Sequence, residues 1–292
     1  TNIFIYYSLI TILLFFIFSI SNVRLFDSLN IAMTIISSGG FLPTNSLSQI
    51  IKTNTQEIIL CIAFLFSALN IFFLINLFKR NNIIADHSED FLIIFTVFIA
   101  TITLFFLIND LSFLETLINI LSSISTSGIT TNKLSGNYSL FFLFLTIVGG
   151  SLMSNTSGVK ILRFYILLKA SFLEIFKLVK PNNIVNQNIL YSNNKINNET
   201  VKLSFFIFIS FFISIFFLSS LLLFDQINFE NSFKLSILTL TNTVNNGIYG
   251  LTDINFSNLL TYSKILIIIF MIIGKIELLS LLLIIRKLFF KN

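Results

Sequence analysis

The sequence has few charged residues. Only 11% of its 292 residues are Asp, Glu, Lys or Arg, whereas a soluble domain carries about a quarter. Apolar residues make up 55% of the chain, and phenylalanine alone supplies 37 residues. This exceeds what a soluble chain of this length could bury. Apolar runs of about 20 residues recur, and each is long enough to cross the apolar core of a bilayer. The composition therefore predicts an integral membrane protein.

Residues that form disulfides or bind transition metals are also scarce. The single cysteine, Cys61, lies inside an apolar run, so no disulfide framework or cysteine metal site is expected. The single histidine, His87, lies in the polar stretch Asp86–Asp90, where we expect a solvated side chain. An intramembrane enzyme or a lipid-handling protein would need paired acids, histidine or a nucleophile with its base at membrane depth. The acids lie at loop edges instead, so no enzyme and no cofactor are predicted.

The net charge of +5 does not indicate nucleic-acid binding, because Lys and Arg lie between the apolar runs and form no patch interleaved with aromatic residues. No cleavable signal peptide is visible. The chain begins at Thr1, and the first apolar run starts at once. We therefore expect that the natural N-terminus is missing.

Long and short apolar segments alternate along the chain. The long ones are Ile3–Ile20, Ile58–Leu77, Phe91–Ile108, Leu140–Lys177, Leu203–Phe224 and Leu259–Ile285. The short ones are Leu25–Ile36, Ser112–Ile124 and Phe229–Val244. The short segments cannot span a bilayer, so they are interpreted as re-entrant helices, which need surrounding protein or a water-filled cavity. The long, short, long order occurs three times and predicts an all-α fold of repeated units.

The first two short segments align without a gap. Asp27 and Glu115 begin them, and a glycine follows each acid after 13 residues, Gly40 and Gly128. In the third copy, which begins near Glu230, the same alignment puts a valine at the glycine position, and Gly247 is a rival placement. The predicted strands comprise Ser37, Ser38, Gly39, Gly40, Ser125, Thr126, Ser127, Gly128, Thr241, Asn242, Thr243, Val244 and Asn245.

These strands have the chemistry of a cation filter. A dehydrated cation needs oxygen atoms in place of its water, and backbone carbonyls of a glycine-containing strand can supply them. Hydroxyl groups add ligands or brace the strand. The preceding short helix directs the negative end of its dipole at the ion. A single such loop is more simply a turn of small residues in a helix bundle. Three copies in phase favour a pore.

The fourth long segment is interrupted in its middle. Tyr138–Lys177 would be about 60 Å long as one helix. A run of small and polar residues from Gly149 to Gly158 is expected to break it into two halves. The alternatives are a static break and a tight turn between two separate spans.

Lys and Arg are distributed asymmetrically between the two ends of the predicted spans. The side that carries the loops between units has 12 of them, the side of the hairpins has 5, and Lys275 lies within a span. Because positive charge accumulates on the cytoplasmic side, the hairpins are predicted to enter the membrane from outside.

Four motifs together resemble the TrkH/KtrB/HKT superfamily of potassium transporters. Ile36–Phe41 and Ile124–Thr131 resemble its second and third filter loops. Gly149–Lys160 resembles its run of small residues before Gly-Ile-Lys, and Met271–Glu277 resembles its Met-x-x-Gly-Arg-x-Glu signature. The resemblance implies span–pore helix–span units around a pseudo-fourfold ion pore. It covers the second unit at residues 1–80, the third at 81–200 and the fourth at 201–292.

The resemblance implies that K⁺ is the bound and transported ion and that an intramembrane loop gates it. The implied gate residues are Gly149, Gly150, Ser151, Ser154, Asn155, Thr156, Ser157, Gly158 and Lys275. Alternatively, Lys275 extends to the cytoplasmic face or pairs with Glu277. The resemblance also implies a cell inner membrane location, a homodimer and a cytoplasmic nucleotide-binding partner of the TrkA or KtrA kind. The Asn-rich stretch Pro181–Asn198 is expected to be a solvated linker, or else a contact for that partner.

Three departures from the family pattern leave alternatives open. Val244 replaces a filter glycine, so a Na⁺ or mixed K⁺/Na⁺ transporter is possible. Lys275 replaces an arginine, which keeps the charge but loses the planar fork. A first unit is missing, and three filter strands cannot close a fourfold ring. A non-conducting membrane subunit is a further alternative.

Overall fold

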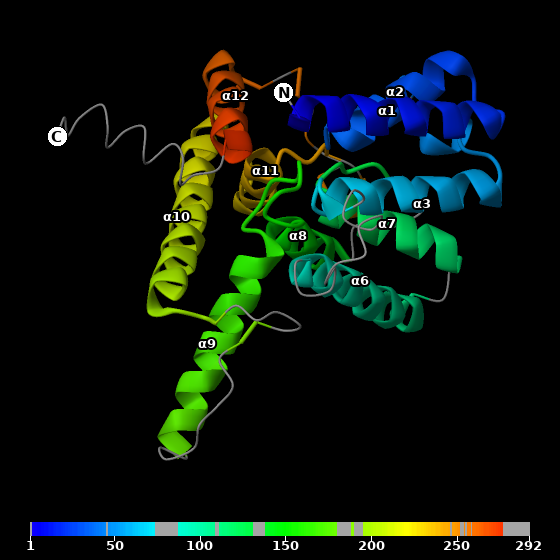
Figure 1. Cartoon of the computed structure of the whole chain (residues 1–292). Coiled ribbons are helices and arrows are strands. Elements are labelled where there is room, and N and C mark those ends of the chain that lie inside the picture. The colour runs from blue at the N-terminus through cyan, green and yellow to red at the C-terminus, as the bar shows by residue number, and fades with distance from the viewer. Residues whose placement is uncertain are drawn as a thin grey trace.

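The computed structural model describes residues 2–44, 46–73, 87–108, 111–130, 138–179, 188–189, 195–245, 247–251, 254, 256–257 and 259–276. Its regular elements are α-helices and short 3-10 helices (Figure 1). The α-helices are α1 Asn2–Ile20, α2 Leu25–Ile36, α3 Asn54–Ala68, α6 Ser88–Leu107, α7 Phe113–Ile124, α8 Ser139–Val148, α9 Ile161–Val179, α10 Asn198–Leu222, α11 Phe229–Leu240 and α12 Thr261–Ile276. The 3-10 helices are η1 Leu47–Gln49, η3 Leu223–Asp225 and η4 Gly247–Tyr249.

The helices form three units of the same order, each with a short helix between two others. The short helix α2 packs against α1 and α3, α7 packs against α6 and α8, and α11 packs against α10 and α12. Contacts of α7 with α3 and of α8 with α11 join the units. Helix α9 extends away from the other helices (Figure 1). The segments that follow the three short helices contact one another at Gly40, Gly128 and Val244.

Helix caps explain where the predicted boundaries were wrong. Helix α3 begins at Asn54, four residues before the predicted start at Ile58, because Thr53 and Gln56 form a capping box. Helix α3 ends at Ala68, and residues 74–77 of the predicted span lie outside the described residues. A second capping box, between Ser112 and Glu115, starts α7 at the predicted position, with Ser112 as the N-cap. Apolar periodicity did not reveal the polar start of α3.

Buried polar residues lie beside an apolar core, and many large apolar side chains are exposed on the outer surface. On α7, the hydroxyl and amide side chains of Asn119, Ser122 and Ser123 are fully buried. Large apolar side chains such as Phe106 on α6 and Phe224 after α10 are more than three-quarters exposed. Two helical stretches, Ser88–Leu107 and Asn198–Asp225, are long and apolar enough to cross a membrane. The exposed apolar side chains fit a molecule whose outer surface faces lipid.

The sequence-based interpretation of His87 is wrong. The imidazole is buried, and its Nδ1 lies 2.8 Å from Oδ2 of Asp90, which is itself fully buried. The ring of Phe73 packs edge-on against the imidazole. Helix α6 begins at Ser88, so this stretch is a packed helix start and not a solvated loop.

Candidate ion pathway

The three hairpins after α2, α7 and α11 share one backbone pattern. Ser37, Ser125 and Thr241 end the helices in the right-handed helical region. The next residues have left-handed φ values of 53°, 55° and 53°, at Ser38, Thr126 and Asn242. In each hairpin the following residue donates its N–H to the carbonyl five positions earlier: Gly39 to Thr34, Ser127 to Ser122 and Thr243 to Leu238. This register places Val244, and not Gly247, in line with Gly40 and Gly128.

In two of the three hairpins the residue with left-handed φ has a strained backbone. Asn242 tolerates positive φ, whereas Ser38 and especially the β-branched Thr126 do not favour it. Such strain persists only where surrounding contacts hold the backbone. The surroundings of Thr126 provide them, since its side chain is fully buried and its Oγ1 accepts the N–H of Ser157 at 3.2 Å.

The strands approach one another so closely that two positions have no room for a side chain. A Cβ at Gly40 would lie 1.7 Å from the carbonyl oxygen of Ser127. A Cβ at Gly128 would lie 2.3 Å from the carbonyl oxygen of Val244. Both glycines also have positive φ, at 73° and 75°. The structure thus brings the three predicted filter strands together at their glycine level, with backbone oxygens at the contacts.

Hydroxyl groups of the second and third hairpins bond to the protein itself. Ser125 Oγ donates to the carbonyl of Ser122 at 3.1 Å, and Ser127 Oγ lies 3.2 Å from Ser125 Oγ. In the third copy, Thr241 Oγ1 donates to the carbonyl of Ile237 at 2.9 Å and lies 2.9 Å from Thr243 Oγ1. These hydroxyls brace the strands and the helix ends of the second and third hairpins. In the first hairpin the buried Oγ of Ser38 has no hydrogen-bond partner among the described residues, so this hydroxyl and the backbone carbonyls are oxygens that could face an ion.

Sequence reasoning missed a tyrosine behind the filter. Tyr249, in η4, is fully buried, and its hydroxyl lies 3.2 Å from Oγ of Ser123 on α7. The contact joins the segment after the third strand to the helix before the second strand. Little in the sequence indicated this contact, because Tyr249 belongs to no repeat and its partner Ser123 lies 126 residues away.

Residues 149–160 form a compact loop between α8 and α9, which confirms the expected break in the fourth span. The loop is narrow at its base, where Val159 N–H donates to the carbonyl of Ile147 and Ile161 N–H donates to that of Gly150. Gly149 and Gly158 have positive φ, and a Cβ at Gly149 would lie 2.4 Å from the carbonyl oxygen of Ser157.

A buried lysine holds the centre of the loop. Lys160 is 2% exposed, and its ammonium donates to the carbonyl of Ser154 at 3.2 Å and to the carbonyl of Thr156. Thr156 Oγ1 also accepts the N–H of Gly150 at 3.0 Å. A buried charge that is fully hydrogen-bonded to carbonyls fixes the shape of an otherwise irregular segment.

The loop lies against the inner ends of the hairpins. Asn155 Nδ2 donates to the carbonyl of Ile36 at 2.7 Å. The ammonium of Lys275, on α12, donates to the carbonyl oxygens of Asn155 at 2.8 Å and Ser37 at 3.1 Å. Lys275 therefore bridges the loop and the first hairpin. Glu277, its alternative partner, lies outside the described residues.

The close crossing of α12 over the end of α11 positions Lys275. A Cβ at Gly274 would lie 2.0 Å from the carbonyl oxygen of Leu240. The amide of Asn242 also donates to the carbonyl of Met271 at 2.8 Å. The glycine in the Met271–Glu277 motif thus has a steric reason, because it lets α12 approach the third hairpin.

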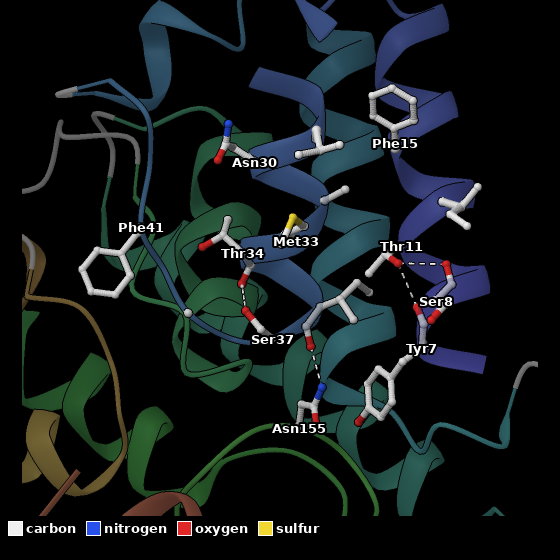
Figure 2. Close-up of a pocket in the computed structure, with 15 residues that line it drawn as sticks. Tyr7, Ser8, Thr11, Phe15, Asn30, Met33, Thr34, Ser37, Phe41 and Asn155 are labelled. Atoms are coloured by element: carbon white, nitrogen blue, oxygen red, sulfur yellow. Dashed lines mark hydrogen bonds between the residues drawn. The ribbon is translucent and has the colours of Figure 1, made fainter. Parts of the chain in front are cut away.

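Two cavities flank the first and third strands. One of about 640 Å³ lies between α1, α2 and the first hairpin, and it reaches Thr34, Ser37 and Asn155 (Figure 2). The other, of about 390 Å³, lies beside Thr243 and Val244. Gly39 and Phe41 line both. The first and third strands are therefore open toward a shared side.

The fold and this arrangement define a helical membrane protein with three inward-facing hairpins and a loop packed beneath them. The structure is similar to that of the potassium transporter TrkH from Vibrio parahaemolyticus, with a TM-score of 0.84 and 20% sequence identity over 96% of this chain and 62% of that one. The chain thus has the TrkH fold, which confirms the predicted all-α fold class and, at the level of fold, the resemblance from which it came.

A sequence relative points the same way. Over 188 residues the chain is 27% identical to the uncharacterized cation transporter MJ1485 of Methanocaldococcus jannaschii. The match covers 61% of this chain and 38% of that protein, so the chain corresponds to only part of it. No protein-family model matches the chain.

The steric reason for Gly274 leads to a stability prediction. Gly274→Ala should destabilise the protein by about 1–3 kcal/mol, because the new Cβ overlaps the Leu240 carbonyl and α12 must move. The measurement is the thermal unfolding midpoint in detergent. Gly247→Ala is the matched control, since a Cβ there meets nothing within 4 Å. Equal midpoints for the two variants would contradict the assignment.

Proposed function

We propose that the protein conducts K⁺ passively into the cell through sites lined by backbone carbonyl oxygens. The observation that carries this proposal is the convergence at Gly40, Gly128 and Val244 of three hairpins that share one backbone pattern up to the preceding residue. Carbonyls held by braced strands can replace the water of a dehydrated cation. No covalent chemistry is required, and K⁺ is the only ligand in this proposal. The names of the two similar proteins are consistent with cation transport.

A complete pore requires a fourth strand and some separation of the three. The carbonyl oxygens of Ser127 and Val244 lie against neighbouring glycines, so an ion needs them to move apart. The shared open side at Gly39 and Phe41 is where a fourth unit would fit. The exposed ring of Phe41 on that side supports this placement.

We propose that the loop of residues 149–160 is the gate. Through Asn155 and Ser157 it contacts the inner ends of two hairpins, and Lys275 ties it to the first. The positive charge of Lys275 repels an approaching cation, and the loop itself closes the path sterically. Conduction requires these contacts to break.

Orientation and partners follow as further parts of the proposal. The protein lies in the cell inner membrane. The hairpins enter this membrane from the side opposite the cytoplasm, and the loops between units, which are rich in Lys and Arg, face the cytoplasm. The protein acts as a homodimer with a cytoplasmic nucleotide-binding subunit of the TrkA or KtrA kind. The unit boundaries at residues 80 and 200 belong to the same proposal.

A Na⁺ or mixed K⁺/Na⁺ transporter is the second candidate, and Val244 favours it. Its φ is not in the positive range that Gly40 and Gly128 share. A carbonyl directed differently from its two counterparts makes the site less symmetric, and such a site discriminates less sharply between the two ions.

The filter role predicts unequal effects at two glycines of different hairpins, Gly128 and Gly39. Gly128→Ala should abolish K⁺-dependent growth and ⁸⁶Rb⁺ uptake, because Cβ would overlap the Val244 carbonyl at a positive φ. Gly39→Ala is the control, since its Cβ would meet the Ser37 hydroxyl at 3.1 Å and Thr34 at 3.5 Å or more, and its φ lies outside the positive range. Unchanged growth with Gly128→Ala, at equal protein in the membrane, would favour a non-conducting subunit.

Ion competition separates K⁺ from Na⁺ transport. Val244→Gly should make ⁸⁶Rb⁺ uptake less sensitive to added Na⁺, because glycine allows the third strand to adopt the backbone of the other two. Val244→Ala keeps the Cβ and should behave as the parent does. If Na⁺ and K⁺ compete equally in the parent protein, the potassium assignment fails.

If the loop is a gate, Lys275 lowers the K⁺ flux by holding the loop closed. Lys275→Gln should raise K⁺ flux by about tenfold, as expected when one charge-assisted hydrogen bond to the closed loop is lost. Lys275→Arg keeps the charge and the donors and should stay near the parent. The measurement is ⁸⁶Rb⁺ flux into proteoliposomes. Equal flux in the Gln variant and the parent would remove Lys275 from the gate.

A further inference from the structure

A buried polar cluster at the start of α6 is not used by the proposed ion pathway. Asp90 accepts the N–H of Asn70 at 2.8 Å through Oδ1 and contacts His87 through Oδ2. Asn70 follows the end of α3, and its Oδ1 accepts the N–H of Phe72 at 3.0 Å. The cluster thus locks the start of α6 to the end of α3 and forms a rigid corner.

Glu89 extends from this corner to the proposed gate loop. Its Oε2 accepts the N–H of Leu152 at 3.3 Å, while Oε1 accepts from Nδ2 of Asn70 at 3.4 Å. Two backbone bonds lie beside it, from Ser151 N–H to the Ala68 carbonyl at 2.9 Å and from Ile71 N–H to the Met153 carbonyl. Glu89 is the side chain that connects the corner to this half of the loop.

The loop therefore has two differently held halves. Residues 150–153 are attached to the corner of α3 and α6, whereas Asn155 and Ser157 contact the hairpins. If the second half moves as a gate, the first half has to stay in place as its hinge. A carboxylate is a strong acceptor for a backbone N–H.

We propose that Glu89 is a positioning residue that anchors the fixed half of the loop and thereby keeps the moving half closed against the filter. The closing role of the loop rests on the function proposed above. The anchoring itself does not, because it concerns where the loop lies and can be measured without ion flux.

A second role for Glu89 has to be separated from this one. The residue lies in the first turn of α6, where any carboxylate stabilises the helix through its dipole. Glu89→Asp keeps that effect but withdraws the carboxylate by about 1.5 Å, one carbon–carbon bond, from Leu152. Glu89→Gln keeps an acceptor oxygen at full length. If Glu89 only stabilises the start of α6, the Glu89→Asp variant should resemble the parent protein. If Glu89 anchors the loop, the Glu89→Gln variant should resemble the parent instead.

Thiol accessibility beneath the filter reports the loop position. Ser157 is 4% exposed, and its Oγ has no hydrogen-bond partner among the described residues, so Ser157→Cys is a conservative probe. Cys61 is replaced by Ser to remove the native thiol. The rate of modification by a small cationic methanethiosulfonate is then measured on the purified protein in proteoliposomes, with the glutamate or a variant at position 89.

We expect Glu89→Ala and Glu89→Asp to raise the modification rate by about tenfold, the effect of losing one hydrogen bond to a charged acceptor. Glu89→Gln should stay within about threefold of the parent. Glu174→Ala is the matched control, because Glu174 is an exposed acid on α9 that pairs only with Lys177 in the described structure. An unchanged rate in Glu89→Ala, or an Asp variant that matches the parent, overturns the proposal.

Flux measured on the same samples separates the two proposals. If modification at Ser157→Cys leaves ⁸⁶Rb⁺ flux unchanged, the gate function fails, while the effect of Glu89 on accessibility still stands. If modification blocks flux but all Glu89 variants are modified at the parent rate, the gate stands and the anchor fails. The ratio of K⁺ to Na⁺ flux should not change in any Glu89 variant, because the filter strands are untouched.

Discussion

The contact between a glycine and a carbonyl oxygen of the next strand is the constraint on which the rest of the structure depends. Gly40 lies against the Ser127 carbonyl and Gly128 lies against that of Val244. Neither contact tolerates a Cβ, so the strands can converge only at these residues. The short helices α2, α7 and α11 have to end just before that point, and the longer helices have to pack around them. The approach of backbone to backbone sets carbonyl oxygens against the glycines of the neighbouring strand.

Burial of backbone and hydroxyl groups inside a lipid-facing shell sets a second requirement. Each hairpin leaves the helix with unpaired carbonyls, and water is not available at that depth to satisfy them. Ser125 and Thr241 bond to carbonyls of the preceding turn, and the ammonium of Lys275 takes the carbonyl of Ser37. Lys160 does the same for the loop between α8 and α9. The ammonium groups of the buried Lys160 and of the exposed Lys275 thus both have a structural part.

The loop between α8 and α9 joins these two requirements. Its glycines allow it to fold back on itself, and Asn155 reaches the hairpins from below. Its other half is attached through Glu89 to a corner made by residues of α3 and α6. The half that faces the hairpins is held by hydrogen bonds from Asn155 to Ile36 and from Lys275 to Asn155, and the other half by hydrogen bonds to Glu89 and Ala68. This division into two separately attached halves underlies the proposed gate role of the loop.

The sequence by itself determined the membrane character, the three repeats and the break after Val148, because apolar length, phase and small-residue runs are local signals. It also supplied the register that aligns Val244 with two glycines. Only the tertiary structure decided the burial of His87 and the roles of Tyr249 and Glu89. Their partners Ser123 and Leu152 lie far away in sequence, and no local pattern encodes a contact between distant segments. Only the tertiary structure could show the convergence of the three strands as well, because it exists only once all three units have packed together.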